Sequence, residues 1–402
     1  MNTALFLSCF LVLSAPAFAW QPDPRVKELT DPAIWAHRMG EMHIQTEPNA
    51  EVHVQQTRHD FGFGTALSTG MFKQDADESV RAKYFQLLID NFNCAVIENA
   101  FKWHQAEPYQ NDLHWTTVDA MLDFCDQHEM PLRGHCLFWA AEKYVPRWVK
   151  DISDEALREA IANRIRVTCE RYRDRIGDYD VNNEMIDHHY FENRLGEEIH
   201  DEMFRMAHEV DPKATLYLND YSILDGSHLD TYEKQIRGFL QRKVPVGGIG
   251  CQGHFLSPTF PSYERIMESL DRLARFGLPI KVTEFDREVD DEQQHARDLD
   301  AFFRICFSHP SVRAILQWGF WEGAHWKPKA ALYRKDFSPK PAAEAYRNLV
   351  FNEWWSDCKA TADSGGKCTV RVFYGHYTIE TDGKTFSVDF PHQEKRKWLD
   401  LR

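Results

Sequence analysis

Two short apolar segments of the chain each end at a glutamate, and this pair is the strongest candidate for chemistry. The segment YDVNNE (179–184) ends at Glu184, and LPIKVTEFD (278–286) carries Glu284 just past its apolar run. Both segments have the pattern of buried strands, which places the two carboxylates at strand ends. Two carboxylates that face one substrate can divide the cleavage of a glycosidic bond, one as a proton donor and the other as an ionised nucleophile or base.

Further polar and aromatic residues occur where other apolar segments end. They are Glu98, Asn99, Lys102, His135, Trp139, Asn183, Gln252, His254, Trp318 and Trp326. Hydrogen-bonding side chains and flat aromatic faces are suited to binding sugar rings. Three more polar residues lie at the ends of these apolar segments, namely Arg133, Asn219 and Asp220. They either bind sugar directly or support the residues that do. Trp103 and Trp115 are interpreted as core residues.

The apolar segments recur at near-regular intervals. They begin at Phe61, Cys94, Pro131, Tyr179, Ala214, Val246, Leu278 and Ala314. Between them lie amphipathic patterns typical of helices, such as 116–129, 153–175 and 262–277. This alternation predicts an α/β fold, a (β/α)₈ TIM barrel whose active site forms at the carboxyl ends of the strands. A doubly wound open sheet is the alternative, but the sequence lacks the glycine-rich phosphate loop that usually follows its first strand.

The two flanks of the barrel are expected to form a small accessory β unit. The predicted boundaries are 20–58 for the N-terminal flank, 59–350 for the barrel and 351–402 for the C-terminal extension. Residues 40–57 and 370–390 alternate with the period of strands. The tetrapeptide Thr381-Asp382-Gly383-Lys384 predicts a hairpin turn.

Residues 1–19 have the pattern of a secretory signal peptide. They are uncharged, are apolar from Ala4 to Val12, and end in Ala17-Phe18-Ala19, so a secreted protein is predicted. The formal net charge of −15 argues against nucleic acid or an anionic membrane as partner and favours a neutral polymer. The cysteines form no CxxC motif or His-rich cluster, so no metal site is predicted. Cys358 and Cys368 flank a short polar loop and are predicted to form a disulfide.

Seven ordered motifs resemble family 10 of the glycoside hydrolases, the endo-β-1,4-xylanases. They are ENAFKW (98–103), RGHCLFW (133–139), DVNNE (180–184), LNDY (218–221), GIGCQGH (248–254), VTEFD (282–286) and QWGFWEG followed by HW (317–326). The resemblance covers about residues 59–350 and implies a retaining mechanism without a cofactor, with Glu184 as acid/base and Glu284 as nucleophile. The two carboxyl groups of a retaining pair lie about 5–5.5 Å apart. Repulsion by ionised Glu284 is then expected to raise the pKa of Glu184.

The other strand-end residues are expected to hold the sugars or the nucleophile. Asn183 would bond the 2-hydroxyl of the sugar being cleaved, and Gln252 and His254 would both orient Glu284. His135 and Lys102, and further out Glu98 and Asn99, would bind the sugars on the non-reducing side. Aromatic faces for the pyranose rings would come from Trp139, Trp318 and Trp326.

The expected substrate is xylan, cut at internal β-1,4 bonds by a monomer. A β-1,4-glucanase on the same barrel is one alternative, because glucose differs from xylose only by an exocyclic CH₂OH group. A catalytically silent carbohydrate-binding barrel is the other. Ala100, Ala140, Asn182 and Cys251 depart from the common family pattern, which affects the shape of the sugar subsites rather than the two carboxylates.

Overall fold

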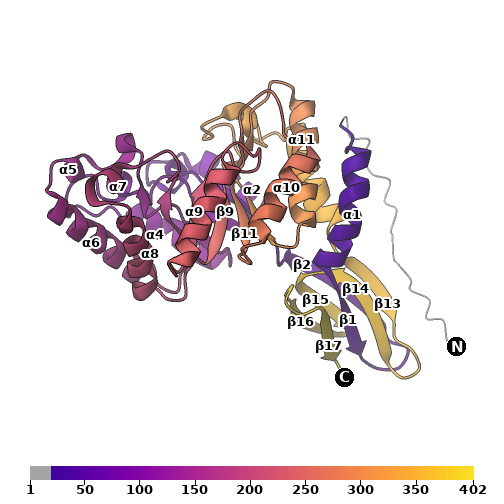
Figure 1. The fold of residues 1–402 in the computed structure, drawn as a ribbon. Coiled ribbons are helices and arrows are strands. Elements are labelled where there is room, and N and C mark those ends of the chain that lie inside the picture. The colour runs from indigo at the N-terminus through magenta and orange to yellow at the C-terminus, as the bar shows by residue number, and fades with distance from the viewer. Residues whose placement is uncertain (1–19) are drawn as a thin grey trace.

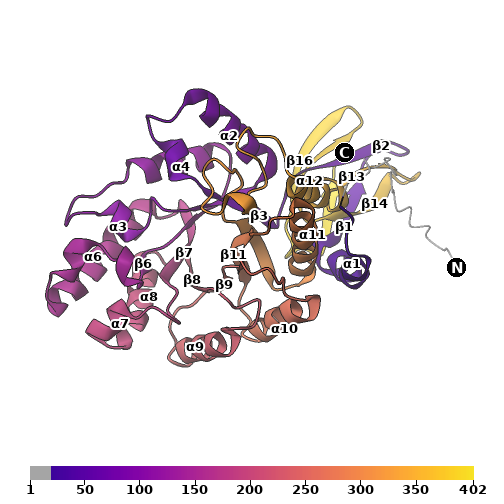
Figure 2. The same cartoon turned by 90° about the horizontal axis from the view of Figure 1, so that it is seen from above.

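The computed structural model describes residues 20–402, so the predicted signal peptide lies outside the described residues. At the centre is a barrel of parallel strands, seen from above in Figure 2. Its strands are β3 (Gly62–Leu67), β4 (Cys94–Ile97), β5 (Leu132–Gly134), β7 (Ile176–Asn183), β8 (Thr215–Asp220), β9 (Gly248–Cys251), β11 (Ile280–Arg287) and β12 (Val312–Gln317). Pairing of β9 with β11 and of β12 with β3 closes the ring. The predicted TIM barrel is therefore confirmed.

Helices follow the strands and surround the barrel (Figures 1 and 2). They are α2 (Glu78–Asn91), α4 (Thr116–Gln127), α6 (Asp154–Tyr172), α8 (Glu198–Val210), α9 (Leu229–Gln241), α10 (Tyr263–Ala274), α11 (Glu292–Ser308) and α12 (Pro341–Asn348). Short helices α3 (Trp103–Ala106), α5 (Arg147–Lys150) and α7 (Tyr190–Leu195), and short strands β6 (Phe138–Trp139) and β10 (His254–Phe255), lie in the connections. The helix α6 begins where its sequence predicts, since the Ser153 side chain accepts a hydrogen bond from the Ala156 amide.

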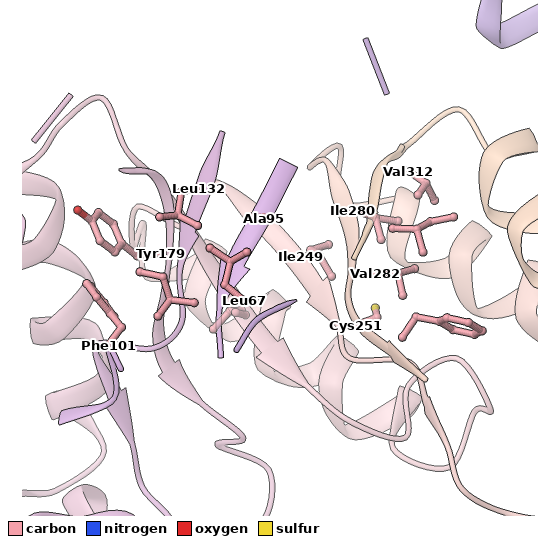
Figure 3. Close-up of a cluster of buried hydrophobic side chains, with 14 of the residues drawn as sticks. Leu67, Ala95, Phe101, Leu132, Tyr179, Ile249, Cys251, Ile280, Val282 and Val312 are labelled. Carbon is pink, nitrogen blue, oxygen red and sulfur yellow. The ribbon is translucent and has the colours of Figure 1, made fainter. Parts of the chain in front are cut away.

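The strands bury apolar side chains between the barrel wall and the helices. Figure 3 shows part of this core, including Leu132, Ile249 and Ile280 from three different strands. In the same cluster Phe101 stacks on Tyr179 with ring centroids 6.0 Å apart. Trp103 and Trp115 are buried, as predicted.

The accessory β unit is built from both flanks, as predicted, and lies beside the barrel (Figure 1). One sheet has the order β14 (Lys367–Phe373), β1 (Met39–Gln45), β17 (Arg396–Asp400). The other has the order β13 (Asp357–Thr361), β2 (Glu51–His59), β15 (Gly375–Thr381), β16 (Lys384–Phe390). The predicted hairpin joins β15 to β16, with Asp382 and Gly383 both at positive φ, 49° and 69°.

Helix α1 (Pro24–Arg38) joins this unit to the barrel. The Arg38 guanidinium donates to the carbonyl oxygens of Phe307 at 2.6 Å and His309 at 2.7 Å, which precede β12. The attachment is therefore near the amino end of a barrel strand, away from the carboxyl ends where a site is expected. Among residues 20–402, no helix is both long and apolar enough to cross a bilayer.

The predicted Cys358–Cys368 disulfide is wrong. The Cys368 thiol is free in the described part of the chain. The two cysteines lie on strands of different sheets, because β13 pairs with β2 whereas β14 pairs with β1. They are therefore not opposite each other on paired strands, and no disulfide joins them, although both pack against the same apolar cluster.

Candidate active site

Glu184 follows directly after β7 and its carboxylate has three donors. Its Oε2 accepts from Trp139 Nε1 at 2.8 Å, and its Oε1 accepts from Gln252 Nε2 at 2.8 Å. His188 Nε2 lies 3.2 Å from Oε2. The backbone of Glu184 is left-handed, with φ of 58°, which turns the chain out of the strand at this residue.

These donors decide the charge of Glu184. Burial favours the neutral acid, but the hydrogen bonds from His188, Gln252 and Trp139 outweigh it and lower the pKa of Glu184 below its usual value. The predicted rise of the Glu184 pKa is therefore wrong, because the pKa is lowered instead. The three donors come from three separate segments of the chain, and each of them favours the carboxylate.

Glu284 lies within β11 and is almost fully buried. Its Oε1 accepts from Asn219 Nδ2 at 2.8 Å, and its Oε2 lies 3.2 Å from His254 Nε2. A second imidazole is near, since His135 Nδ1 lies 3.8 Å from Oε1. This carboxylate therefore has nitrogen atoms around both of its oxygens.

His254 supplies a positive charge beside Glu284. Its Nδ1 lies 3.0 Å from Asp286 Oδ1, so the ring is held between two carboxylates. Burial disfavours the charged ring, but Asp286 and Glu284 outweigh it and raise the pKa of His254 to about 10. The raised pKa of His254 keeps its ring in the protonated form over a wider pH range, with Nε2 at 3.2 Å from Glu284 Oε2. Asp286 is itself held by Trp326, whose Nε1 donates to Oδ2 at 2.7 Å.

Two amide residues connect the strands that carry the glutamates. Asn219 donates its side chain to Glu284 and its carbonyl oxygen accepts from the Glu184 amide at 3.0 Å. Gln252 contacts the same two glutamates with the roles exchanged. Its side chain donates to the Glu184 carboxylate, and its carbonyl oxygen accepts from the Glu284 amide at 2.8 Å. The two residues thus form reciprocal bridges that fix one carboxylate relative to the other.

The expectation that Gln252 and His254 both contact Glu284 through their side chains is therefore half wrong. His254 contacts Glu284, but the Gln252 side chain contacts Glu184. Gly253 has a φ of 82°, which breaks the alternation between β9 and β10. Residues two apart therefore do not point the same way here.

Asn183 belongs to the same network. Its Oδ1 accepts from Asn219 Nδ2 at 2.9 Å, and its side chain is almost fully buried next to Glu184. Asn219 in turn accepts from Thr283 Oγ1 at 2.6 Å. Asn219 is therefore a support for the site, and Asp220 supports the turn after Glu184 by accepting from the Ile186 amide at 3.0 Å.

One wall of the site consists of Lys102 and two tryptophans. The Lys102 ammonium lies 4.9 Å from the Trp139 ring centroid and 5.8 Å from that of Trp318. It also donates to Asn99 Oδ1 at 3.1 Å. Glu98 interacts electrostatically with Lys102. Burial raises the pKa of Glu98 above its usual value, and the positive charge of Lys102 opposes this rise.

His135 connects this wall to the side of the site that carries Glu284. Its ring meets the Trp318 ring edge-on with centroids 5.1 Å apart, and its Nδ1 lies 2.9 Å from Asp180 Oδ2. Asp180 also forms an ion pair with Arg133, so Arg133 is a buried residue that supports the site rather than a sugar ligand.

Trp326 is the most exposed of the predicted sugar-binding aromatic residues. Its side chain is 48% accessible, and its ring centroid lies 5.3 Å from that of His254.

Four residues of the site were not singled out from the sequence. They are His188, Asp286, Asp180 and Tyr144, which stacks on Trp139 with centroids 4.0 Å apart. Asp180 and Asp286 lie inside the DVNNE and VTEFD motifs, three residues before Asn183 and two residues after Glu284, which is a signal that could have found them. His188 and Tyr144 lie in loops, where no strand pattern predicts their direction. Within residues 20–402, no group of three or more His, Cys, Asp or Glu side chains is arranged to hold a metal ion.

The site thus contains two carboxylates, one directly after β7 and one in the second half of β11. Asn219 and Gln252 bridge them, and hydrogen-bonding and aromatic side chains surround them. Comparison with known sequences agrees with this arrangement of the site. The sequence model of the family described as Glycosyl hydrolase family 10 matches residues 53–349. Endo-1,4-beta-xylanase 1 of Arabidopsis thaliana is 35% identical over 364 residues, covering 88% of this chain and 37% of that protein. The anti-sigma-I factor RsgI6 of Acetivibrio thermocellus is 35% identical over 341 residues, covering 84% of this chain and 43% of that protein.

Solved structures give the same fold. The crystal structure of xylanase 10B from Thermotoga petrophila RKU-1 in complex with xylobiose is similar with a TM-score of 0.67 and 26% identity, covering 73% of this chain and 95% of that one. The chain spans less than half of the length of the first curated relatives that it matches. The family match nevertheless covers most of this chain and includes every barrel strand. The chain therefore belongs to glycosyl hydrolase family 10.

Proposed function

We propose that the chain is a secreted, retaining endo-β-1,4-xylanase, with Glu284 as nucleophile and Glu184 as acid/base. The observation that carries this proposal is the difference in environment between two cross-bridged carboxylates. Glu284 is almost fully buried among nitrogen atoms of Asn219, His254 and His135, and the pKa of His254 beside it is raised to about 10. Glu184 faces His188, Gln252 and Trp139, of which only the histidine can exchange a proton.

The first step would form a covalent intermediate. Glu284 attacks the anomeric carbon, the glycosidic C–O bond breaks, and Glu184 gives a proton to the departing oxygen. Asn183, whose Oδ1 accepts from Asn219, would donate its amide N–H to the 2-hydroxyl of the reacting sugar. Such a bond strengthens as positive charge develops on the ring.

The second step would release the sugar with retained configuration. Glu184, now a carboxylate, takes a proton from water, and the water oxygen attacks the anomeric carbon as the bond to Glu284 breaks. The backbone and side-chain bridges through Asn219 and Gln252 keep the two carboxylates in position for both steps.

The choice of xylan is supported by the relatives and by the wall around Lys102. Several similar proteins are named endo-1,4-beta-xylanases, and one similar structure is a complex with xylobiose. Lys102 and Asn99 offer donors and acceptors for sugar hydroxyls, and Trp318 and Trp139 offer ring faces beside them. Secretion is supported by the pattern of residues 1–19.

A substrate panel tests this proposal. Reducing ends should be released from xylan at a rate at least about tenfold above that from carboxymethyl cellulose, mixed-linkage glucan or mannan, because one exocyclic CH₂OH in a closed pocket costs roughly 1–3 kcal/mol. Short oligosaccharides from the start of the reaction, rather than single xylose units, would mark internal cleavage. Faster release from mixed-linkage glucan would make the protein a glucanase, and no release from any polymer would favour a binding role.

A further inference from the structure

His188 contacts the proposed acid/base residue, and the function described above gives it no role. It lies four residues after Glu184 in the turn that follows β7, and its amide donates to the Glu184 carbonyl at 3.2 Å. Its ring nitrogen Nε2 is 3.2 Å from Glu184 Oε2, and about a third of its side chain is exposed. The turn and the ion pair therefore hold the imidazole against the carboxylate while leaving it open to water.

The three donors to Glu184 are not equivalent. The Trp139 indole and the Gln252 amide carry N–H groups that do not ionise near neutral pH. His188 is the one of the three whose proton can move within this pH range. The carboxylate therefore has two fixed hydrogen bonds and one mobile proton.

We propose that His188 and Glu184 share the proton that is delivered to the leaving group, so that His188 is a positioning residue and proton store for the acid/base. This inference rests on the proposed function, since it takes Glu184 as the proton donor. It accounts for a feature that the simple two-carboxylate scheme leaves open, namely how a carboxylate with three donors supplies a proton.

The proton can be followed through both steps. Before the reaction it lies on His188 Nε2, and moving it along the contact to Oε2 leaves neutral His188 and neutral Glu184. Glu184 then passes it to the glycosidic oxygen as the C–O bond breaks. In the second step Glu184 takes a proton from the attacking water and returns it to His188, which restores the starting state without any further reagent.

Other charged groups face this pair and must be considered with it. The hydrogen bond to Glu184 raises the pKa of His188, burial opposes the rise, and the charges of Glu184, Asp187 and Asp220 add to it. Asp187 is hydrogen-bonded by Tyr221 and lies 3.9 Å from His228 Nε2. Burial raises the pKa of Asp220 to about 7, although its bonds from the Ile186 and Tyr221 amides oppose this. Asp220 is therefore the neighbour that must be separated from His188 by experiment.

The shared proton sets the alkaline limit of activity. When two coupled groups share one proton, the proton leaves the pair at a pH at least as high as it would leave either group alone. Histidine ordinarily holds its proton to a pKa of about 6.5, whereas glutamate does so only to about 4.3. Removing His188 should therefore move the alkaline limb of the rate profile to lower pH, and never to higher pH.

The test compares His188→Gln with His189→Gln. Glutamine keeps a hydrogen-bond donor but cannot hold the mobile proton, and His189 pairs with Glu192 instead of Glu184, at 2.9 Å. The pH dependence of kcat/KM on a xylo-oligosaccharide should show the alkaline midpoint lowered by about one pH unit or more in His188→Gln. The midpoint in His189→Gln should equal that of the parent. An unchanged midpoint in His188→Gln, with activity present, would overturn the inference while leaving the proposed function intact.

Two further measurements complete the design. In Asp220→Asn the alkaline limb should persist, with its midpoint lowered less than in His188→Gln, because Asp220 contributes least to the His188 pKa among the acidic groups that face it. Disappearance of the limb in Asp220→Asn would assign it to Asp220 and overturn the inference. In the parent protein, the ¹⁵N resonances of His188 should titrate with the same midpoint as the alkaline limb. A clearly different midpoint would overturn the inference without any variant, and inactivity of the parent on every polymer would instead overturn the proposed function.

Discussion

Replacing Glu284 by alanine is expected to abolish hydrolysis of xylan and of aryl xylosides alike. Without the carboxylate no covalent intermediate can form, whichever leaving group the substrate carries. The loss should be on the order of 10⁵-fold or more in kcat, as for removal of a nucleophile in other covalent mechanisms. Initial rates on both substrates measure it.

The control for this variant separates chemistry from folding. Glu284→Gln keeps the shape and one acceptor for Asn219, so it should fold as the parent does and be equally inactive. Glu292→Ala removes a half-exposed glutamate that pairs with Arg334 at the start of α11, and it should keep parental rates. Near-normal xylan hydrolysis by Glu284→Gln would remove Glu284 from the role of nucleophile.

Replacing Glu184 by alanine is expected to separate two kinds of substrate. Xylan has a poor leaving group that needs a proton, so kcat/KM on xylan should fall by about 10²–10⁴-fold. An aryl xylobioside whose phenol leaves without protonation should still form the intermediate at a rate close to the parental one. The intermediate then accumulates, because no base activates the water of the second step.

Azide provides the positive control for Glu184→Ala. It attacks the intermediate without needing a base, so added azide should restore turnover of the aryl substrate and give a β-xylobiosyl azide. Glu202→Ala, which removes an exposed partner of Arg158 on α8, is the matched neutral substitution. If xylan and the aryl substrate lose activity equally, and azide restores neither, Glu184 is not the acid/base.

The barrel and most positions in the site follow from patterns that are local in sequence. Each barrel strand is an apolar run, and a parallel barrel brings the carboxyl ends of all its strands to one face. Residues that end such runs, such as Glu98, His135 and Glu284, could therefore be placed together without knowing any contact. Helix α1 was not anticipated, although Asp23 and Pro24 form the kind of start signal that precedes a helix.

The partners of each side chain depend on geometry that the sequence does not show. The direction of Gln252 depends on the positive φ of Gly253, and the charge of Glu184 depends on donors from residues 139, 188 and 252. The contact of His188 with Glu184 could not be predicted from the sequence, because it depends on the turn of the chain at Glu184. This turn brings His188, four residues later, against the Glu184 carboxylate. The Cys358–Cys368 prediction failed because a short separation along the chain does not give two cysteines the geometry of a disulfide.

The most direct test of the account is to trap the covalent intermediate on Glu284. A 2-fluoro xylobioside with an activated aryl leaving group should react once, because fluorine slows both steps and the good leaving group restores the first. Intact-protein mass spectrometry should then show the addition of one fluorinated xylobiosyl group, and peptide mapping should place it on Glu284. A label on any other residue, or continued turnover of xylan by a protein that never carries the label, would contradict the retaining mechanism proposed here.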